Sequence, residues 1–152
     1  MERIAVFPGS FDPLTLGHAD IINRGLSIFD RIIIGIGNNA EKKYMFQLSQ
    51  REQWITQTFQ NEKRIEVKSY NGLTVDFCKK VNAGFILRGL RNSADFEFEK
   101  AIAHMNGAIS DNIETVFVMS DLKFGALSSS IIRDIIRNGG NPSAFLPSAV
   151  KY

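Results

Sequence analysis

The 152-residue sequence predicts one α/β domain built on a doubly wound, five-stranded parallel sheet. Five short apolar runs alternate with amphipathic stretches along the whole chain. The second run, residues 32–36, carries no polar side chain, which is typical of a central strand covered on both faces. No repeat, low-complexity segment or linker divides the chain. We therefore expect a single domain of the Rossmann-like type over residues 1–152.

The apolar runs predict strands at residues 4–7, 32–36, 65–69, 85–87 and 115–119. The first helix is expected near residues 17–29, with Ile21, Ile22, Leu26 and Phe29 on its apolar face. Ser49 and Glu52 have the spacing of a capping box, which predicts a second helix that ends near Phe59. The remaining helices are expected at residues 73–81, 94–109 and 130–137, the last ended by Gly139 and Gly140.

Composition excludes several classes of partner and site. Lys and Arg number 18 against 16 Asp and Glu, and a net charge of +2 is too small to indicate nucleic acid. The one cysteine, Cys78, excludes an internal disulfide framework and a cysteine-based zinc site. We find no signal peptide and no apolar run long enough for a membrane, so we expect a cytoplasmic chain without a membrane partner.

Ligands of parallel α/β sheets bind beyond the carboxyl ends of the strands. After the first strand, Gly9 and Ser10 form a tight turn, and Thr15 and His18 follow on the first turn of a helix. Gly9 allows close approach of backbone N–H groups, and a helix N-terminus favours phosphate. Ser10 and His18 can each donate a hydrogen bond to that phosphate. An ordinary turn with a helix cap at Thr15 explains the same residues equally well.

Basic residues follow two other strands. Arg88 and Arg91 lie after the fourth strand and can reach one polyanion, with Gly89 allowing close backbone approach. Ion pairs in a solvated loop are the alternative. Lys42 and Lys43 follow the second strand, where they are either solvated surface or a phosphate contact.

Three serines, residues 128–130, precede the last helix, although one cap is enough for a helix. Their hydroxyls and the N–H groups of the first turn can form an anion cradle, to which Arg133 adds charge. Phe11, Phe46 and Phe124 fall in the loops at the same edge, where they can stack on a base or line an apolar pocket.

Two other features favour a structural reading. Residues 35–40 match the dinucleotide pattern G-x-G-x-x-A, but no helix opens there and no acidic residue follows about twenty positions on. We therefore do not expect a nicotinamide site. His104 lies in the middle of a predicted helix, where a structural role is expected rather than catalysis.

Four motifs together carry a family resemblance. They are T-L-G-H at residues 15–18, R-G-L-R at 88–91, A-D-F-E-F-E at 94–99 and S-S-S-I-I-R at 128–133. The first and last look like the T/HxGH and SSSxxR/K signatures of nucleotidyltransferases. The set as a whole resembles the bacterial phosphopantetheine adenylyltransferase family, over nearly the whole chain. Many members of that family have Thr where Ser10 stands and Trp where Phe124 stands.

The resemblance implies a step of coenzyme A synthesis, in which ATP and 4′-phosphopantetheine give dephospho-coenzyme A and pyrophosphate. It also implies Mg²⁺ bound with ATP, a homohexamer and coenzyme A as a feedback inhibitor. Phe59, Phe77 and Phe96 are candidates for the interface or the core. Because the attacking group is already a phosphate oxygen, we expect direct in-line displacement without a general base or a covalent enzyme intermediate.

Roles for individual residues follow from the same resemblance. The catalytic residues would be His18, Lys42 and Arg91. The acceptor side would use Ser10, Lys42, Leu73, Thr74 and Arg88. The ATP side would use Ser10, Phe11, His18, Gly89, Leu90, Arg91, Glu99, Phe124, Gly125, Ala126, Leu127, Ser128, Ser129 and Ser130. No protein ligand for a metal is implied.

Two other functions remain open from the sequence. One is a related nucleotidyltransferase with a different acceptor, such as nicotinamide mononucleotide, or glycerol phosphate with CTP. The R-G-L-R motif at residues 88–91, which resembles the phosphopantetheine adenylyltransferase family, argues against this alternative. The other is a non-catalytic sensor of coenzyme A or a nucleotide, against which the complete set of polar site residues argues.

Overall fold

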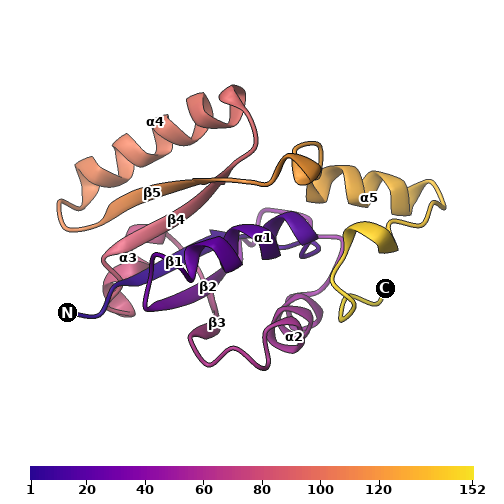
Figure 1. Cartoon of the computed structure of the whole chain (residues 1–152), viewed down its shortest axis with the longest axis horizontal. Coiled ribbons are helices and arrows are strands. Elements are labelled where there is room, and N and C mark those ends of the chain that lie inside the picture. Colours follow the sequence, from indigo (N-terminus) through magenta and orange to yellow (C-terminus); the bar gives the residue numbers. More distant parts are fainter.

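Five parallel strands pair in the order β3-β2-β1-β4-β5 in the computed structural model, which describes all residues 1–152 (Figure 1). The strands are β1 (Ile4–Gly9), β2 (Arg31–Gly37), β3 (Ile65–Tyr70), β4 (Phe85–Leu90) and β5 (Glu114–Met119). The helices are α1 (Leu16–Gly25), α2 (Leu48–Thr58), α3 (Thr74–Lys80), α4 (Ser93–Ile109) and α5 (Ser129–Arg137). Two single-turn 3-10 helices follow β5 and α5, η1 (Leu122–Phe124) and η2 (Ser143–Phe145). The predicted fold class is confirmed, and none of the helices has the length and apolar character needed to cross a membrane.

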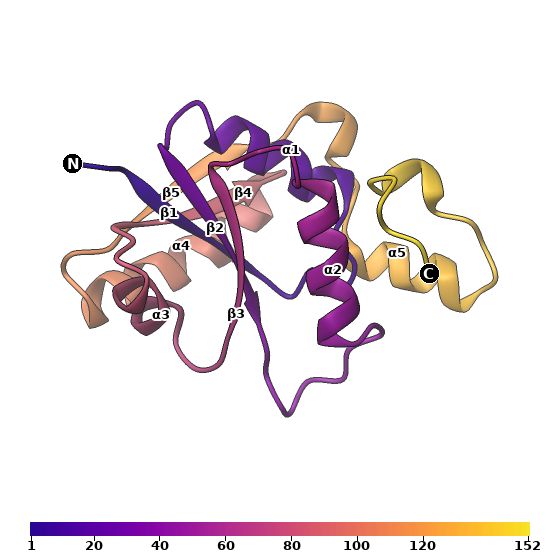
Figure 2. The ribbon, with the colours of Figure 1, turned by 90° about the horizontal axis from the view of Figure 1, so that it is seen from below.

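The sheet is covered on both faces because alternate strand residues point to opposite sides. Phe7 and Ile34 belong to the larger core, which α1, α2 and α5 cover. Val6 and Ile33 belong to the smaller core, which α3 covers. Helix α4 lies along β4 and β5 (Figure 1). Figure 2 shows α2, α5 and the C-terminal segment at one end of the molecule, where Val150 joins the larger core.

Strand β4 is longer than the sequence predicts. Arg88, Gly89 and Leu90 continue the ladder and pair with residues 117–119 of β5. Arg88 therefore lies within the strand and not in the loop after it. Strand β1 likewise runs on to Gly9, past the proline at which the prediction ended it.

Two predicted helix boundaries are wrong. Helix α1 ends at Gly25, so Phe29 reaches the core from the following loop. Helix α2 begins at Leu48, with Gln47 as a cap that makes no side-chain hydrogen bond, so the predicted capping box does not form. The chain entering α2 is held by Asp12 instead, whose carboxylate accepts hydrogen bonds from backbone N–H groups just before the helix.

The strand order reverses between β1 and β4. From β1 the chain builds outward through β2 and β3, and then crosses to the other side to form β4 and β5. Helices on either side of this point diverge, and a crevice opens beyond the carboxyl ends of β1 and β4. The segments selected from the sequence lead into this crevice.

Candidate active site

Two clefts open at the carboxyl ends of β1 and β4. The larger, of about 730 Å³, lies between the strand ends and α4 and is termed the α4 cleft. The smaller, of about 360 Å³, lies between the turn after β1 and the N-terminus of α5 and is termed the turn cleft. The residues that line both clefts are Pro8, Gly9, Ser10, Lys42, Arg88 and Glu99. This junction brings together the basic residues that the sequence places after separate strands.

Lys42 and Arg88 both reach the end of β1. Lys42 Nζ donates a hydrogen bond to Ser10 Oγ over 2.9 Å, and Arg88 Nη1 donates to the carbonyl oxygen of Pro8 over 2.7 Å. One side chain comes from the connection between β2 and α2, and the other comes from β4. Two cations from different parts of the chain therefore contact neighbouring residues at the end of β1.

Arg88 is oriented by Glu99. Its Nε and Nη2 donate to the two carboxylate oxygens of Glu99, over 2.8 and 2.5 Å. Glu99 is the only buried residue of α4, and it lies at the junction and not on one side of it. The planar pair and the bond to Pro8 use three of the five guanidinium N–H donors, which leaves two for a ligand.

His18 closes the N-terminus of α1 and faces the turn cleft. Thr15 Oγ1 accepts from the backbone N–H of His18, and His18 Nδ1 accepts from the backbone N–H of Thr15 over 3.0 Å. The second bond leaves the imidazole hydrogen on Nε2. Burial, together with the positive charges of Arg88 and Arg91, lowers the pKa of His18 from 6.5 to about 4. A neutral donor therefore faces the cleft at pH 7.

Arg91 is held at the other wall of the turn cleft. Its Nε and Nη2 donate to the carboxylate of Asp95 over 3.0 and 3.1 Å, and its Nη1 donates to the carbonyl oxygen of Leu127 over 3.1 Å. The pairing with Arg91 holds the pKa of Asp95 below its usual value. Arg91 thus joins the start of α4 to the segment before α5.

The serines before α5 also have protein partners. Ser128 caps the helix by accepting from the N–H of Ile131, and Ser130 accepts from Arg133. Ser129 donates its hydroxyl hydrogen to the carbonyl oxygen of Pro13 over 2.8 Å. All three serines line the turn cleft, and Ser129 also ties the start of α5 to the turn after β1.

Comparison with known proteins decides the family. A family model described as cytidylyltransferase-like matches residues 6–135. A phosphopantetheine adenylyltransferase of Flavobacterium psychrophilum is 60% identical over 149 residues, which cover 98% of this chain and 98% of that protein. The chain belongs to the phosphopantetheine adenylyltransferase family. The prediction from the four motifs is confirmed.

Further relatives agree. The phosphopantetheine adenylyltransferase of Flavobacterium johnsoniae is 57% identical over 149 residues, which cover 98% of this chain and 97% of that protein. A crystal structure of a bifunctional NMN adenylyltransferase/ADP ribose pyrophosphatase from Francisella tularensis superposes with a TM-score of 0.72 at 20% identity. It covers 99% of this chain and 46% of that chain, and it supports the fold alone.

Most residues expected from the phosphopantetheine adenylyltransferase resemblance line one of the clefts. Those in the turn cleft are Ser10, Phe11, His18, Lys42, Arg88, Gly89, Arg91, Glu99, Phe124, Leu127, Ser128, Ser129 and Ser130. Thr74 lines the α4 cleft. Four expected residues reach neither cleft: Leu73, Leu90, Gly125 and Ala126. Leu73 is an exposed cap of α3, and Leu90 is buried in the sheet.

The three aromatic residues selected at this edge have different environments in the structure. Phe11 is buried, with its ring centroid 5.1 Å from that of His18, so it supports the imidazole and offers no face to a base. Phe46 packs edge-on against Trp54 and lines neither cleft. Phe124 lines the turn cleft and remains the one candidate of the three for stacking.

Sequence reasoning missed much of the α4 cleft. Tyr44, Tyr70 and Asn106 line it, together with Ile102. Tyr70 stacks on Phe77 with centroids 4.4 Å apart, and burial raises the pKa of its hydroxyl. The place of Tyr70 at the end of β3 could have indicated it, whereas no pattern shows which face of α4 turns toward the strands.

Candidate nucleophiles and metal ligands elsewhere in the chain do not add to the site. Burial raises the pKa of Cys78 to about 12, and Cys78 lies outside both clefts, as does the exposed His104. No three or more His, Cys, Asp or Glu side chains are grouped so that they could hold a metal ion.

Proposed function

We propose that this chain transfers the adenylyl group of ATP to 4′-phosphopantetheine, giving dephospho-coenzyme A and pyrophosphate. The observation that carries the proposal is the meeting of two clefts at Ser10, Lys42 and Arg88. A reaction between two phosphates needs two ligand sites that join where positive charge is concentrated. Identity of 60% and 57% to relatives named for this activity supports the same assignment.

ATP is assigned to the turn cleft. Its triphosphate meets the donor His18, the guanidinium of Arg91 and the N-terminus of α5, which together favour anionic oxygens. Phe124 supplies an aromatic face for the base. The α4 cleft takes the pantetheine arm, whose amides and short apolar segments suit a lining of Asn106, Thr74 and Ile102.

The proposed reaction is a direct displacement. A phosphate oxygen of 4′-phosphopantetheine, held by Lys42 and Arg88, attacks the α-phosphorus of ATP. The new P–O bond forms as the bond from that phosphorus to the oxygen bridging the α- and β-phosphates breaks, and pyrophosphate leaves with the electron pair. Arg91 and the Nε2–H of His18 stabilise the charge on the phosphates. No side chain becomes covalently linked.

Mg²⁺ is proposed to arrive with ATP. Three carboxylates line the clefts: Glu99 and Asp95 are each paired with an arginine, and Asp12 accepts from two backbone N–H groups, so they do not form a metal-binding group. The residues present therefore suit an ion held by phosphate oxygens. When bound, Mg²⁺ would neutralise part of the triphosphate charge.

Coenzyme A is proposed as an inhibitor that binds across both clefts. It shares the pantetheine arm and the adenosine diphosphate part of the reaction product, and so it would cover the junction at Lys42 and Arg88. It should therefore raise the apparent KM for both substrates.

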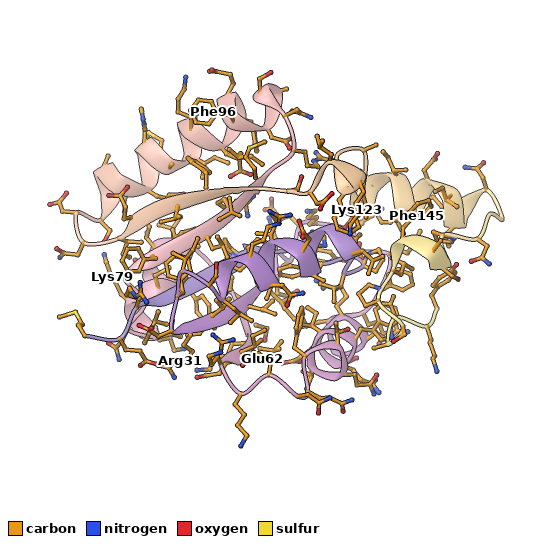
Figure 3. All side chains as sticks on the ribbon, in the orientation of Figure 1. Arg31, Glu62, Lys79, Phe96, Lys123 and Phe145 are labelled. Carbon is orange, nitrogen blue, oxygen red and sulfur yellow. The ribbon has the colours of Figure 1, made fainter.

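A homohexamer is proposed from the family resemblance and from α4. The helix leaves Phe98, Met105 and Ile109 exposed on one side, and Phe96, which packs edge-on against Phe117 of β5, is also partly exposed. Figure 3 shows side chains of α4 projecting away from the sheet, and labels Phe96 on this helix. Of the three phenylalanines considered from the sequence, Phe77 is in the smaller core and Phe59 packs against the larger core, so Phe96 is the interface candidate. Exposed apolar patches of this kind mark protein–protein contacts.

An acceptor panel tests the proposed function. Pyrophosphate release from ATP is measured with 4′-phosphopantetheine, with nicotinamide mononucleotide and without an acceptor, and release from CTP is measured with glycerol phosphate. We expect release only with ATP and 4′-phosphopantetheine. Turnover with another acceptor would favour a related nucleotidyltransferase, and binding without turnover would favour a sensor.

A further inference from the structure

Arg51, on α2, is a buried charge that touches neither cleft. It is 1% exposed, and neither cleft includes it in its lining. Its Nη1 donates to the carbonyl oxygen of Ser10 over 2.7 Å, and its Nε donates to that of Phe46 over 3.1 Å. The guanidinium also lies 4.1 Å from the ring centroid of Tyr44. Burial of a guanidinium is costly, so its contacts must be well satisfied to hold it there.

Asp12 makes the reciprocal connection. Its carboxylate, in a residue that is 3% exposed, accepts from the backbone N–H groups of Met45 and Phe46 over 2.8 and 2.9 Å. Arg51 thus reaches from α2 to the turn after β1, and Asp12 reaches from that turn to the segment before α2. These crossed contacts are termed the Arg51–Asp12 clamp.

The clamp holds both ends of a contact at the cleft junction. Ser10, whose carbonyl oxygen is bound to Arg51, accepts from Lys42 through its hydroxyl. Lys42 lies three residues before Met45, which Asp12 holds. Tyr44, beneath the guanidinium, closes the intervening loop because its hydroxyl accepts from the N–H of Asn39 and donates to the carbonyl oxygen of Gly37.

We propose that Arg51 is a positioning residue for the transfer reaction, and that together with Asp12 it fixes Lys42 and Ser10 at the junction of the two clefts. The proposal rests on the proposed function. Displacement of a reacting group by about 1 Å can lower a rate by about 100-fold. The fork of an arginine can bind two carbonyl groups at once, whereas the ammonium of a lysine acts as a point charge and does not reproduce that geometry.

The test compares Arg51→Lys with Arg64→Lys. Arg64 also bridges to a backbone carbonyl, that of Leu26. Neither Leu26 nor the other partner of Arg64, Glu62, lines a cleft, whereas Arg51 binds Ser10. In Arg51→Lys we expect kcat/KM for 4′-phosphopantetheine to fall by about 10- to 100-fold, with circular dichroism and ATP affinity close to those of the unaltered chain. Arg64→Lys should retain the activity of the unaltered chain.

A double-mutant cycle separates positioning from a purely structural role. If Arg51 acts through Lys42, adding Arg51→Lys to Lys42→Ala should cause little further loss of activity, because the two changes remove one interaction. Full multiplication of the two losses would overturn the proposal. Asp12→Asn tests the clamp from its other end and should also lower kcat/KM for 4′-phosphopantetheine.

Other outcomes are equally decisive. Folded Arg51→Lys and Asp12→Asn chains with unaltered kinetics would overturn the positioning role, as would loss of the fold in both. Failure of the proposed function looks different, because the unaltered chain would then release no pyrophosphate with 4′-phosphopantetheine.

Discussion

His18 caps a helix and lines the turn cleft with one imidazole. Its Nδ1 completes the cap of α1 with Thr15, and the opposite ring nitrogen carries the hydrogen toward the turn cleft. The cap fixes the orientation of the ring, and burial keeps it neutral. The two readings that the sequence left equally balanced, a helix cap and a phosphate donor, are compatible in one side chain.

Replacement of His18 by alanine should lower kcat strongly and change ATP affinity much less. The lost donor acts on charge in the transition state, and removal of one such donor typically costs about 2.7–4 kcal/mol. Steady-state kinetics with a separate ATP titration checks this prediction. A kcat close to that of the unaltered chain would reject the role.

The low pKa of His18 predicts a loss of stability in acid. Between about pH 6.5 and pH 4 the unfolded chain binds a proton at this imidazole and the folded chain does not, so the free energy of unfolding falls as the pH falls. The expected loss from pH 7 to pH 4 is about 2–3 kcal/mol more for the unaltered chain than for His18→Ala. Urea titrations of both chains at each pH measure it, and equal losses would contradict the stated pKa.

Replacement of Arg88 or Arg91 by lysine should weaken the binding of the two substrates to different extents. Arg88→Lys should weaken 4′-phosphopantetheine binding more than ATP binding, by about 1.5–3 kcal/mol, because a fork held by Glu99 becomes a point charge. Arg91→Lys should show the opposite bias. Calorimetric titration of each variant with each ligand is the measurement. If both substitutions lower the affinity for both ligands equally, the assignment of one substrate to each cleft is wrong.

The positions of Lys42, Arg88 and Arg91 could be predicted because each lies at or after the carboxyl end of a parallel strand. Glu99, on α4, is expected only from the family resemblance. Arg51 could not be predicted, since the sequence around it has the spacing of a capping box that does not form.

Phe46 was assigned to the ligand edge by its position, but it packs inward against Trp54, where burying a large ring is favourable, and Phe11 lines the turn cleft while its side chain is almost entirely buried. Position in a loop does not reveal which way an aromatic ring points.

At the scale of elements, Gly89 explains why β4 was predicted too short. A glycine two residues after an apolar run indicates the end of a strand, whereas Gly89 lies within β4. A Cβ atom there would come within 2.7 Å of Ile21 Cγ1 on α1. The glycine therefore allows α1 to pack closely on β4. The low strand propensity of glycine suggests a loop at this position, but the close packing of α1 on β4 requires a glycine within the strand.

Gly89→Ala should lower the free energy of unfolding by about 1–3 kcal/mol, the usual range for an overpacked site. Gly84→Ala is the matched control, because a Cβ atom at Gly84 would meet nothing within 4 Å. Chemical denaturation of both variants measures the difference. If Gly89→Ala is as stable as Gly84→Ala, α1 does not constrain this position.

For the whole molecule, the exposed apolar side chains of α4 predict assembly. Light scattering at micromolar concentration should give six times the mass of the chain. Phe98→Glu should lower that mass, since it places a charge on an apolar side chain that is 67% exposed. A monomeric mass for the unaltered chain would contradict the homohexamer.

The overall architecture could be predicted because the hydrophobic periodicity and the order of strands and helices can be read directly from the sequence. The α4 cleft could not, because it depends on how one helix is rotated above β4 and β5. Ile102 and Asn106 line the cleft, while the exposed Phe98 and Met105 do not, and nothing in the sequence distinguishes the two kinds of position.

The ratio of the two reaction products, dephospho-coenzyme A and pyrophosphate, tests the central claim most directly. ATP, Mg²⁺ and 4′-phosphopantetheine are incubated with the chain, and both products are quantified by mass spectrometry and a pyrophosphate assay. One dephospho-coenzyme A should form for each pyrophosphate, and no pyrophosphate should appear without the acceptor. Release of pyrophosphate without 4′-phosphopantetheine, or no dephospho-coenzyme A in its presence, would contradict direct transfer between the two clefts.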